Sequence, residues 1–254
     1  MTQSVTAIVL AAGAGKRMQS ELPKPLHLVG GQPMIDWVLN ALVDERITSG
    51  VVVIGHGGEE IRSHLESTLS NSAKWRFVIQ DQQLGTGHAT SVALEGVSDL
   101  DPESILVLPG DTPLLRSSSI SEFLDGHFSN GASLSVLSAV VDAPTGYGRI
   151  VHDSKGDFVG IVEERDASDE QRTISEINTG IMVGSALALQ SALQRVGRGN
   201  AQGEFYLTDV VGILVADGEK VRAEILADST EAQGVNDPDQ RAFCEMVLNQ
   251  RHSN

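Results

Sequence analysis

With 254 residues, 27.0 kDa and 41% hydrophobic residues, the chain can bury a substantial core, which excludes global disorder. Its 18 Lys and Arg against 34 Asp and Glu give a net charge of −16, which argues against nucleic acid as the main partner because phosphate backbones are repelled. The single cysteine, Cys244, excludes an intramolecular disulfide. No apolar stretch approaches the roughly 20 residues needed to cross a bilayer, so we expect a cytoplasmic protein without a membrane partner.

The N-terminal half alternates short apolar runs with amphipathic stretches. The first run is β-branched and almost continuously apolar, as expected of a strand buried on both faces. In chain order, the pattern predicts strands at Val5–Ala11, Val51–Ile54, Trp75–Ile79 and Ser104–Leu108, and helices at Pro33–Val43, Glu59–Leu69 and Gly87–Leu94. This repeated order of strand and helix implies a parallel sheet with helices on both faces.

The second half follows a different pattern, in which turn residues separate most of the strands. The pattern predicts strands at Ala132–Val141, Arg149–Val151, Phe158–Val162 and Ile177–Val183, and helices at Ala186–Arg195, Tyr206–Ala216 and Asp239–Asn249. We expect these strands to form a smaller antiparallel or mixed elaboration packed onto the parallel sheet. The fold class is therefore α/β, in one compact domain.

The loop after the first strand is suited to phosphate. Ligands of open parallel sheets bind beyond the carboxyl ends of the strands, and here Gly13 and Gly15 precede Lys16 and Arg17. Glycines let backbone N–H groups approach an anion closely. A P-loop would need glycine at position 10 and Ser or Thr after the lysine, and a dinucleotide fingerprint would need glycine at position 18, so both are excluded. The loop alone fits an ordinary tight turn with solvent-facing cations equally well.

A further cation follows this loop between two prolines. Pro23 and Pro25 stiffen the chain and restrict where Lys24 can point. Arg17 and Lys24 are therefore placed to flank one polyphosphate, which favours a phosphate-binding loop over an ordinary turn.

The segment Leu10–Met18 with the later Leu22–Lys24 resembles the signature of the sugar nucleotidyltransferase superfamily. The remaining motifs resemble, in the same order and over essentially the whole chain, the uridylyltransferase domain of the bacterial bifunctional enzyme that makes UDP-N-acetylglucosamine. They are Gln80, Gln83–Ala89, Gly110–Leu114, Pro144–Ile150, Ile161–Glu163, Glu176–Gly180, Asn200–Asp209 and Gly234–Asn236. The resemblance implies a Rossmann-like nucleotidyltransferase fold and transfer of UMP from UTP to N-acetyl-α-D-glucosamine 1-phosphate, with Mg²⁺ as cofactor.

The resemblance also implies roles for particular residues. Those for the nucleotide are Leu10, Ala11, Ala12, Gly13, Gln80, Gly85 and Thr86, and those that neutralise phosphates in catalysis are Arg17 and Lys24. Those for the sugar are Gly148, Glu163 and Asn178, and those for the metal are Asp111 and Asn236. The Gln80 amide offers both a donor and an acceptor to the imide edge of uracil, and the carboxylate of Asp111 is a hard oxygen ligand suited to Mg²⁺.

Other interpretations of single residues stay open. Asp111 also fits a turn or a helix cap, and Glu163, taken alone, fits a solvated acid in an acidic run. No general base is needed, since the attacking phosphate is already ionised, so His88 is assigned to packing or local hydrogen bonding. His56 and His127 show no usable pairing.

The chain departs from the family pattern at four positions. Lys16 replaces a common threonine, Pro25 a valine, Pro109 a tyrosine and Asp237 a second asparagine. Loss of the tyrosine hydroxyl removes one possible substrate contact and bears on sugar selectivity, whereas none of the four touches the phosphate or metal chemistry.

The sequence also leads to expectations about domain boundaries, oligomeric state and alternative functions. The resemblance implies a nucleotide-binding half at about 1–130, a sugar-binding half at about 131–236, and a C-terminal helix in 237–254 that corresponds to the family's linker. No hexapeptide repeat of the family's acetyltransferase domain is present, so we expect a monomer or weak oligomer. The alternatives are the same chemistry with another sugar 1-phosphate or nucleotide, and a non-catalytic regulator that binds a nucleotide sugar.

Overall fold

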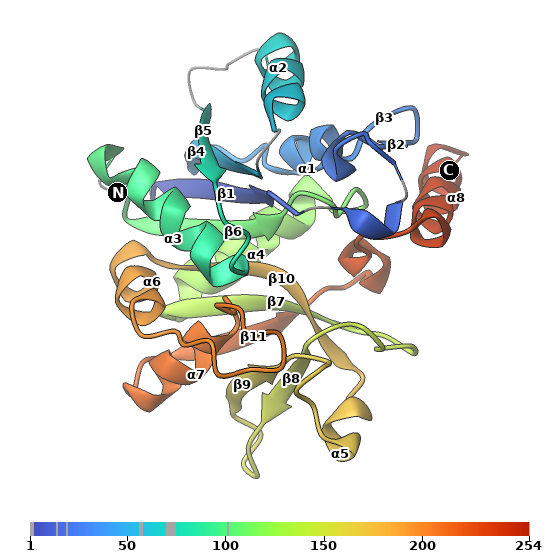
Figure 1. Ribbon diagram of the computed structural model, residues 1–254. Helices are drawn as coiled ribbons and strands as arrows, with labels where there is room; N and C mark the ends of the chain where they lie inside the picture. Colours follow the sequence, from blue (N-terminus) through green and yellow to red (C-terminus); the bar gives the residue numbers. More distant parts are fainter. Residues whose placement is uncertain are drawn as a thin grey trace.

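A nine-stranded sheet runs through the molecule, with the strand order β11-β7-β10-β6-β1-β4-β5 (Figure 1). The computed structural model describes residues 3–13, 15–18, 20–55, 58–69, 75–100 and 102–253. The strands of this sheet are β1 (Val5–Ala11), β4 (Ile47–Gly55), β5 (Trp75–Gln80), β6 (Ser104–Pro109), β7 (Leu134–Val140), β8 (Arg149–His152), β9 (Phe158–Val162), β10 (Glu176–Ser185) and β11 (Val221–Ile225). A separate two-stranded sheet consists of β2 (Leu28–Val29) and β3 (Gln32–Pro33).

The four strands of the N-terminal half are parallel, as the sequence predicts. β1 pairs with β4 and β6, and β4 pairs with β5, all in parallel register. Their carboxyl ends therefore meet at one edge, where the loops after Ala11, Gln80 and Pro109 begin.

The second half extends this sheet. β10 lies antiparallel to β6 on one side and to β7 on the other, and β11 is parallel to β7. This confirms the mixed sheet, but the new strands join edge to edge instead of packing onto the parallel sheet as expected. The physical reason is that the outer edge of β6 would otherwise leave its backbone N–H and C=O groups unpaired. Within the described part of the chain, β8 and β9 branch away from this order, through the pairing of β8 with β10.

Two hydrophobic cores lie on opposite faces of the sheet. Val5, Ala7 and Val9 of β1 face one core, while Ile8 faces the other, because side chains alternate along a strand. The first core includes residues of α1 (Met34–Ala41), α2 (Glu59–Thr68) and α4 (Ser117–Asn130), and the second includes residues of α3 (Thr86–Gly96), α6 (Ala186–Leu193) and α7 (Asp209–Ala216). Helices thus cover both faces, which confirms the α/β fold class.

Several elements are not foreseen in the sequence analysis. The helix α4 begins with three serines and contains Gly126, so its helical sequence pattern is weak. Its residues Ile120, Phe123 and Leu124 are nevertheless buried in the core. The strand β11 carries alternating polar residues typical of a sheet edge. The short helix α5 (Asp169–Arg172) is held by a capping box at Ser168.

The C-terminal helix α8 (Pro238–Ser253) packs beside β2, at the right of Figure 1. Its Cys244, Val247 and Leu248 form a small third core with Val29 and other buried residues. Burial raises the pKa of the Cys244 thiol to about 12, so this cysteine is a packing residue and not a nucleophile.

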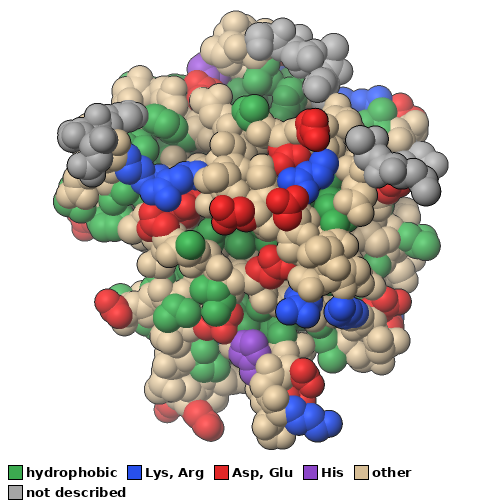
Figure 2. Space-filling view, turned by 180° about the vertical axis from the view of Figure 1, so that it is seen from behind, with side chains coloured by type: hydrophobic (Ala, Val, Ile, Leu, Met, Phe, Trp, Pro, Cys, Tyr) green, Lys and Arg blue, Asp and Glu red, His purple; other side chains and the backbone are tan. Residues whose placement is uncertain are grey.

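The structure has the helices and the surface charges that the apolar runs and the acidic composition of the chain predict. Within the described ranges, no helix is long and apolar enough to span a membrane. On the face shown in Figure 2, Lys and Arg side chains lie in small groups beside Asp and Glu side chains and do not gather into one basic surface.

Candidate active site

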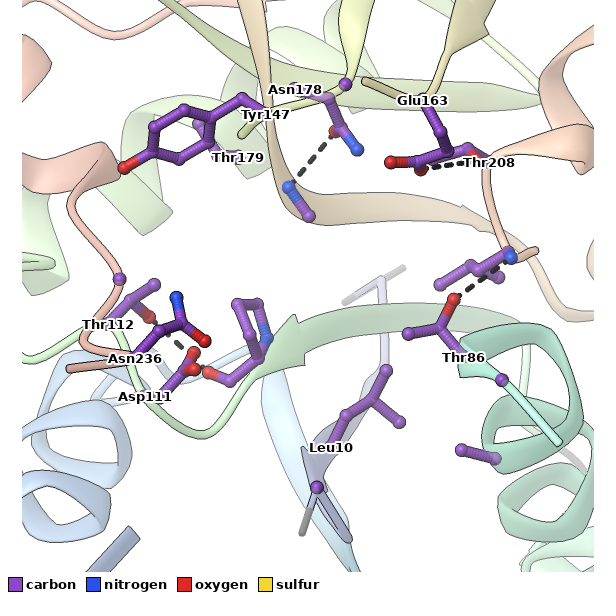
Figure 3. Close-up of a pocket in the computed structure, with 18 of the residues that line it drawn as sticks. Leu10, Thr86, Asp111, Thr112, Tyr147, Glu163, Asn178, Thr179, Thr208 and Asn236 are labelled. Carbon is purple, nitrogen blue, oxygen red and sulfur yellow. Dashed lines mark hydrogen bonds between the residues drawn. The ribbon is translucent and has the colours of Figure 1, made fainter. Parts of the chain in front are cut away.

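A cavity of about 550 Å³ lies at the carboxyl edge of the parallel strands. This is where open α/β sheets bind ligands, and the volume suits a small organic substrate. Predicted site residues from both halves of the chain line it, namely Leu10, Ala12, Gly13, Gln80, Gly85, Thr86, Asp111, Gly148, Glu163, Asn178 and Asn236. Figure 3 shows Asp111 and Asn236 at one end of the cavity, Thr86 at the other, and Glu163 and Asn178 across from them.

Three predicted residues do not line the cavity. Ala11 ends β1 with its side chain in the sheet core, 5% exposed, so only its backbone is available to a ligand. Arg17 is exposed on the short 3₁₀ helix Lys16–Met18. Lys24 begins a second 3₁₀ helix, Lys24–Leu26, and reaches the cavity through the contacts of its ammonium group.

The ammonium group of Lys24 bridges the two predicted metal ligands. Its Nζ donates to Asp111 Oδ2 and, at 2.7 Å, to Asn236 Oδ1. The backbone keeps these ligands together, because Val235 N donates to Asp111 O at 2.9 Å. Gly110 N in turn donates to Leu10 O at 2.9 Å, which ties the Asp111 turn to β1. Two oxygen atoms from distant segments therefore converge on one cation.

This oxygen pair fits Mg²⁺ as well as an ammonium group. Carboxylate and amide oxygens are hard ligands, and Mg²⁺ commonly binds proteins through one or two such groups while keeping waters and phosphate oxygens. Among the described residues, no group of three or more His, Cys, Asp or Glu side chains could hold a metal ion. A metal bound by Asp111 and Asn236 would therefore take its remaining ligands from water or substrate.

The end of the cavity at Thr86 is built where a distant loop, residues 204–207, packs against the start of α3. Gly85 has φ 109°, a conformation that favours glycine. Gly87 N donates to Phe205 O and Phe205 N donates to Leu84 O, both at 2.8 Å. The Thr86 hydroxyl accepts from Leu207 N at 3.1 Å. The polar groups of residues 84–87 are thus held by a segment from the other half of the chain.

Gln80, the last residue of β5, is 4% exposed and lies under this loop. Its Nε2 donates to Gly85 O at 3.1 Å and lies 3.0 Å from His88 Nδ1. The donor side of the amide is therefore already used inside the protein. Of the donor and the acceptor that we expect Gln80 to offer a base, only the acceptor, Oε1, is left.

The opposite wall of the cavity carries the predicted sugar ligands. The Thr208 hydroxyl donates to Glu163 Oε1 at 2.9 Å, and burial raises the pKa of Glu163 above its usual range. This carboxylate is not the solvated acid that its acidic run allowed. Asn178 and Thr179 lie at a register irregularity of β10, where Asn178 Oδ1 accepts from Gly180 N at 3.0 Å. The irregularity lets neighbouring residues of one strand line the same cavity.

An ion pair between the buried Arg149 and the partly exposed Glu164 holds the loop before β8. Arg149 is 1% exposed, and it donates to Tyr147 O and, at 2.7 Å, to Glu164 Oε2. Gly146 N also donates to Glu164 Oε2, at 3.1 Å. The Arg149 guanidinium lowers the pKa of Glu164 below its usual range, so the pair stays ionised. The ion pair therefore joins the loop that carries Gly148 to Glu164, the residue after Glu163.

Other lining residues are not singled out in the sequence analysis, although they lie inside its motifs. Tyr147 stands between Gly146 and Gly148, and burial raises the pKa of its phenol. Gln83 lines the cavity and donates to Ala12 O at 2.6 Å, which ties the loop before α3 to the glycine loop. Thr208 also lines the cavity. Each of these three residues lies in a motif named in the sequence analysis, which could have marked it as a candidate. Only the structure shows that its side chain lines the cavity.

The departures from the family pattern have local explanations where they are described. Pro25 is buried in its 3₁₀ helix, and Pro109 ends β6 on the cavity wall. Asp237 accepts from Gln240 N at 2.9 Å and so caps the first turn of α8. The side chain of Lys16, like His56, lies outside the described residues.

The chain is similar to several known proteins. The family model of the MobA-like NTP transferase domain matches residues 7–156. Among curated relatives, the bifunctional protein GlmU of Heliobacterium modesticaldum is 46% identical over 97% of this chain and 52% of its own length. The bifunctional protein GlmU of Corynebacterium efficiens is 43% identical over 98% of this chain and 51% of its own length. The chain thus spans about half the length of these relatives.

A solved structure supports the fold independently. A Bacillus anthracis protein assigned as a glucose-1-phosphate thymidylyltransferase, in complex with sucrose, superposes with a TM-score of 0.75 at 19% identity, covering 96% of this chain and 95% of that one. At this identity the likeness concerns the fold alone. The match of the family model over residues 7–156 leads to one conclusion: the chain belongs to the family of the MobA-like NTP transferase domain.

Proposed function

We propose that the protein transfers UMP from UTP to N-acetyl-α-D-glucosamine 1-phosphate, giving UDP-N-acetylglucosamine and pyrophosphate. One observation carries the proposal: a single cavity gathers a base end at Gln80, a cation-binding pair at Asp111 and Asn236, and a polar wall at Glu163 and Asn178. The match to the NTP transferase domain supports nucleotidyl transfer, and the resemblance carried by the ordered motifs is the ground for this substrate pair.

The reaction needs positioning and charge neutralisation more than a reactive side chain. An oxygen of the sugar phosphate attacks the α-phosphorus of UTP, and pyrophosphate leaves in line, without a covalent intermediate on the protein. Both reactants are anionic, so cations that meet the phosphates contribute most of the stabilisation. We assign this role to Arg17 and Lys24.

The nucleotide would lie on the glycine loop, against the backbone of Leu10, Ala11, Ala12 and Gly13, with its base between Gln80, Gly85 and Thr86. Bound Mg²⁺, held by Asp111 and Asn236, would supply further neutralisation of the polyphosphate. In the structure Lys24 bridges these two oxygens with two of its three N–H groups, so one N–H group is left for a phosphate, and Mg²⁺ would compete with the ammonium group for the same oxygens.

The sugar would lie against the opposite wall. The Glu163 carboxylate keeps one oxygen beyond its bond to Thr208 and can accept from a sugar hydroxyl. Asn178 offers amide hydrogens, and Gly148 leaves room for close approach, since a β-carbon there would lie 3.4 Å from Glu163 Oε2. This division supports a nucleotide-binding half at about 1–130, a sugar-binding half at about 131–236 and a separate C-terminal helix in 237–254. The cytoplasmic location and the monomeric or weakly oligomeric state stay predictions.

The deciding experiment measures pyrophosphate release with UTP, CTP, GTP and dTTP, each crossed with the 1-phosphates of N-acetylglucosamine, glucosamine and glucose, at saturating Mg²⁺. We expect the highest kcat/KM with UTP and N-acetylglucosamine 1-phosphate. Strict preference for another pair would support a nucleotidyltransferase of different specificity. Binding of both substrates without pyrophosphate release would instead support the regulator.

A further inference from the structure

The amide of Gln80 has only one orientation that satisfies its neighbours. The Gly85 carbonyl can only accept a hydrogen bond, so the nitrogen of the Gln80 amide must face it, at 3.1 Å. The same nitrogen lies 3.0 Å from His88 Nδ1. An amide nitrogen only donates, so His88 Nδ1 has to be the acceptor and the imidazole proton has to sit on Nε2.

Both amide hydrogens of Gln80 are therefore engaged within the protein. No described residue forms a hydrogen bond with Gln80 Oε1, and Gln80 lines the cavity at its base end. A bound base meets a hydrogen-bond acceptor at this position and no donor.

From this geometry we infer that His88 is a positioning residue that locks the Gln80 amide with its oxygen toward the cavity, and that this lock selects bases carrying an imide N–H. The inference rests on the proposed function, because it concerns the base of the nucleotide. Uracil and thymine carry a hydrogen on N3, which Gln80 Oε1 can accept. Cytosine carries a lone pair on N3, so two acceptors would face each other and one buried polar group would stay unpaired.

The Gly85 carbonyl supplies one of the two acceptors that hold the amide, and His88 supplies the other. Without the acceptor at His88, one hydrogen of Gln80 Nε2 loses its partner, so the free-energy difference between the two amide orientations falls, although Gly85 O still opposes the turned one. Such a turned amide matches the N3 acceptor of cytosine. His88 itself is half-buried on the first turn of α3, with its ring centroid 6.5 Å from that of Phe205. A phenyl ring there keeps this packing and removes the Nδ1 acceptor, together with an Nε2–H group that donates to no described residue.

The test compares His88→Phe with His88→Asn, whose side-chain oxygen can take the place of Nδ1 as acceptor. The ratio of kcat/KM for UTP to that for CTP is measured by pyrophosphate release, with KM for the sugar phosphate as an internal control. Loss of a matched polar contact commonly changes such a ratio by about tenfold or more. We expect that decrease in His88→Phe, near-normal selectivity in His88→Asn, and an unchanged sugar-phosphate KM in both.

An unchanged UTP-to-CTP ratio in folded His88→Phe would overturn the inference, as would equal losses with both nucleotides, which indicate a merely structural role. If the phenyl variant does not fold, His88→Leu repeats the measurement. If the unsubstituted protein releases no pyrophosphate with any nucleotide, the proposed function fails, and calorimetric binding of UMP and CMP to the same variants decides the inference by the same ratio.

Discussion

Replacing Lys24 by Met should strengthen divalent-cation binding while weakening catalysis. The Lys24 ammonium bridges Asp111 and Asn236, and the Lys24 and Asp111 side chains are 11% and 20% exposed, so this pair is neither freely solvated nor fully desolvated. A hydrogen bond to a charged group contributes about 1.5–3 kcal/mol. Because 1.4 kcal/mol corresponds to a factor of ten, freeing the two oxygens should tighten cation binding by about 10- to 150-fold.

The assay is a titration with Mn²⁺, followed by electron paramagnetic resonance, in the absence of nucleotide. Arg17→Met is the matched control, since it removes one positive charge from the same region, and Arg17 forms no hydrogen bond or ion pair with a described residue. We expect tighter Mn²⁺ binding in Lys24→Met, little change in Arg17→Met, and lower turnover in both. Unchanged or weaker Mn²⁺ binding in Lys24→Met would refute the idea that its ammonium occupies the metal position.

Three further predictions concern the metal, the base loop and the sugar wall. Asp111→Asn should reduce turnover by several orders of magnitude with the thermal unfolding midpoint nearly unchanged, and near-normal turnover would show that the ligand is misassigned. Gly85→Ala should lower the free energy of unfolding in urea by about 1–3 kcal/mol more than Gly156→Ala, because a β-carbon at Gly85 would lie 2.5 Å from Phe205 O, whereas one at Gly156, also at positive φ, meets nothing within 4 Å. Equal losses would mean that backbone conformation alone is responsible. Burial raises the pKa of Glu163, so its carboxylate is protonated at higher pH than an exposed glutamate, and KM for the sugar phosphate should rise as the medium becomes mildly acidic. Glu163→Gln should lose this pH dependence, and an identical KM profile in that variant would argue against a Glu163 contact with the sugar.

Local sequence pattern was sufficient where an element carries its own signal. The continuous apolar run of β1 and the helical periodicity after Pro33 reflect burial on a sheet and on one helix face, so both were predicted within a few residues. The helix α4 was missed because its serines and Gly126 weaken the pattern, and its formation depends on the core that Phe123 enters.

The sequence by itself determined the class of protein and the composition of the candidate site. A glycine loop with Arg17 and Lys24, a carboxylate after a buried strand, and their order with the later motifs are properties of the chain that need no coordinates. They predict a phosphate-binding α/β protein because glycine, lysine and aspartate have those chemical capacities wherever the fold places them.

Only the tertiary structure decided how these groups are directed. Thr86 holds Leu207, 121 positions away, and Lys24 reaches Asn236 across 212 positions. The Gln80 amide is oriented by Gly85 and His88 together. No local pattern specifies such partners, because a hydrogen bond depends on where the whole fold brings its donor and acceptor, and that position is set by the packing of both halves on one sheet.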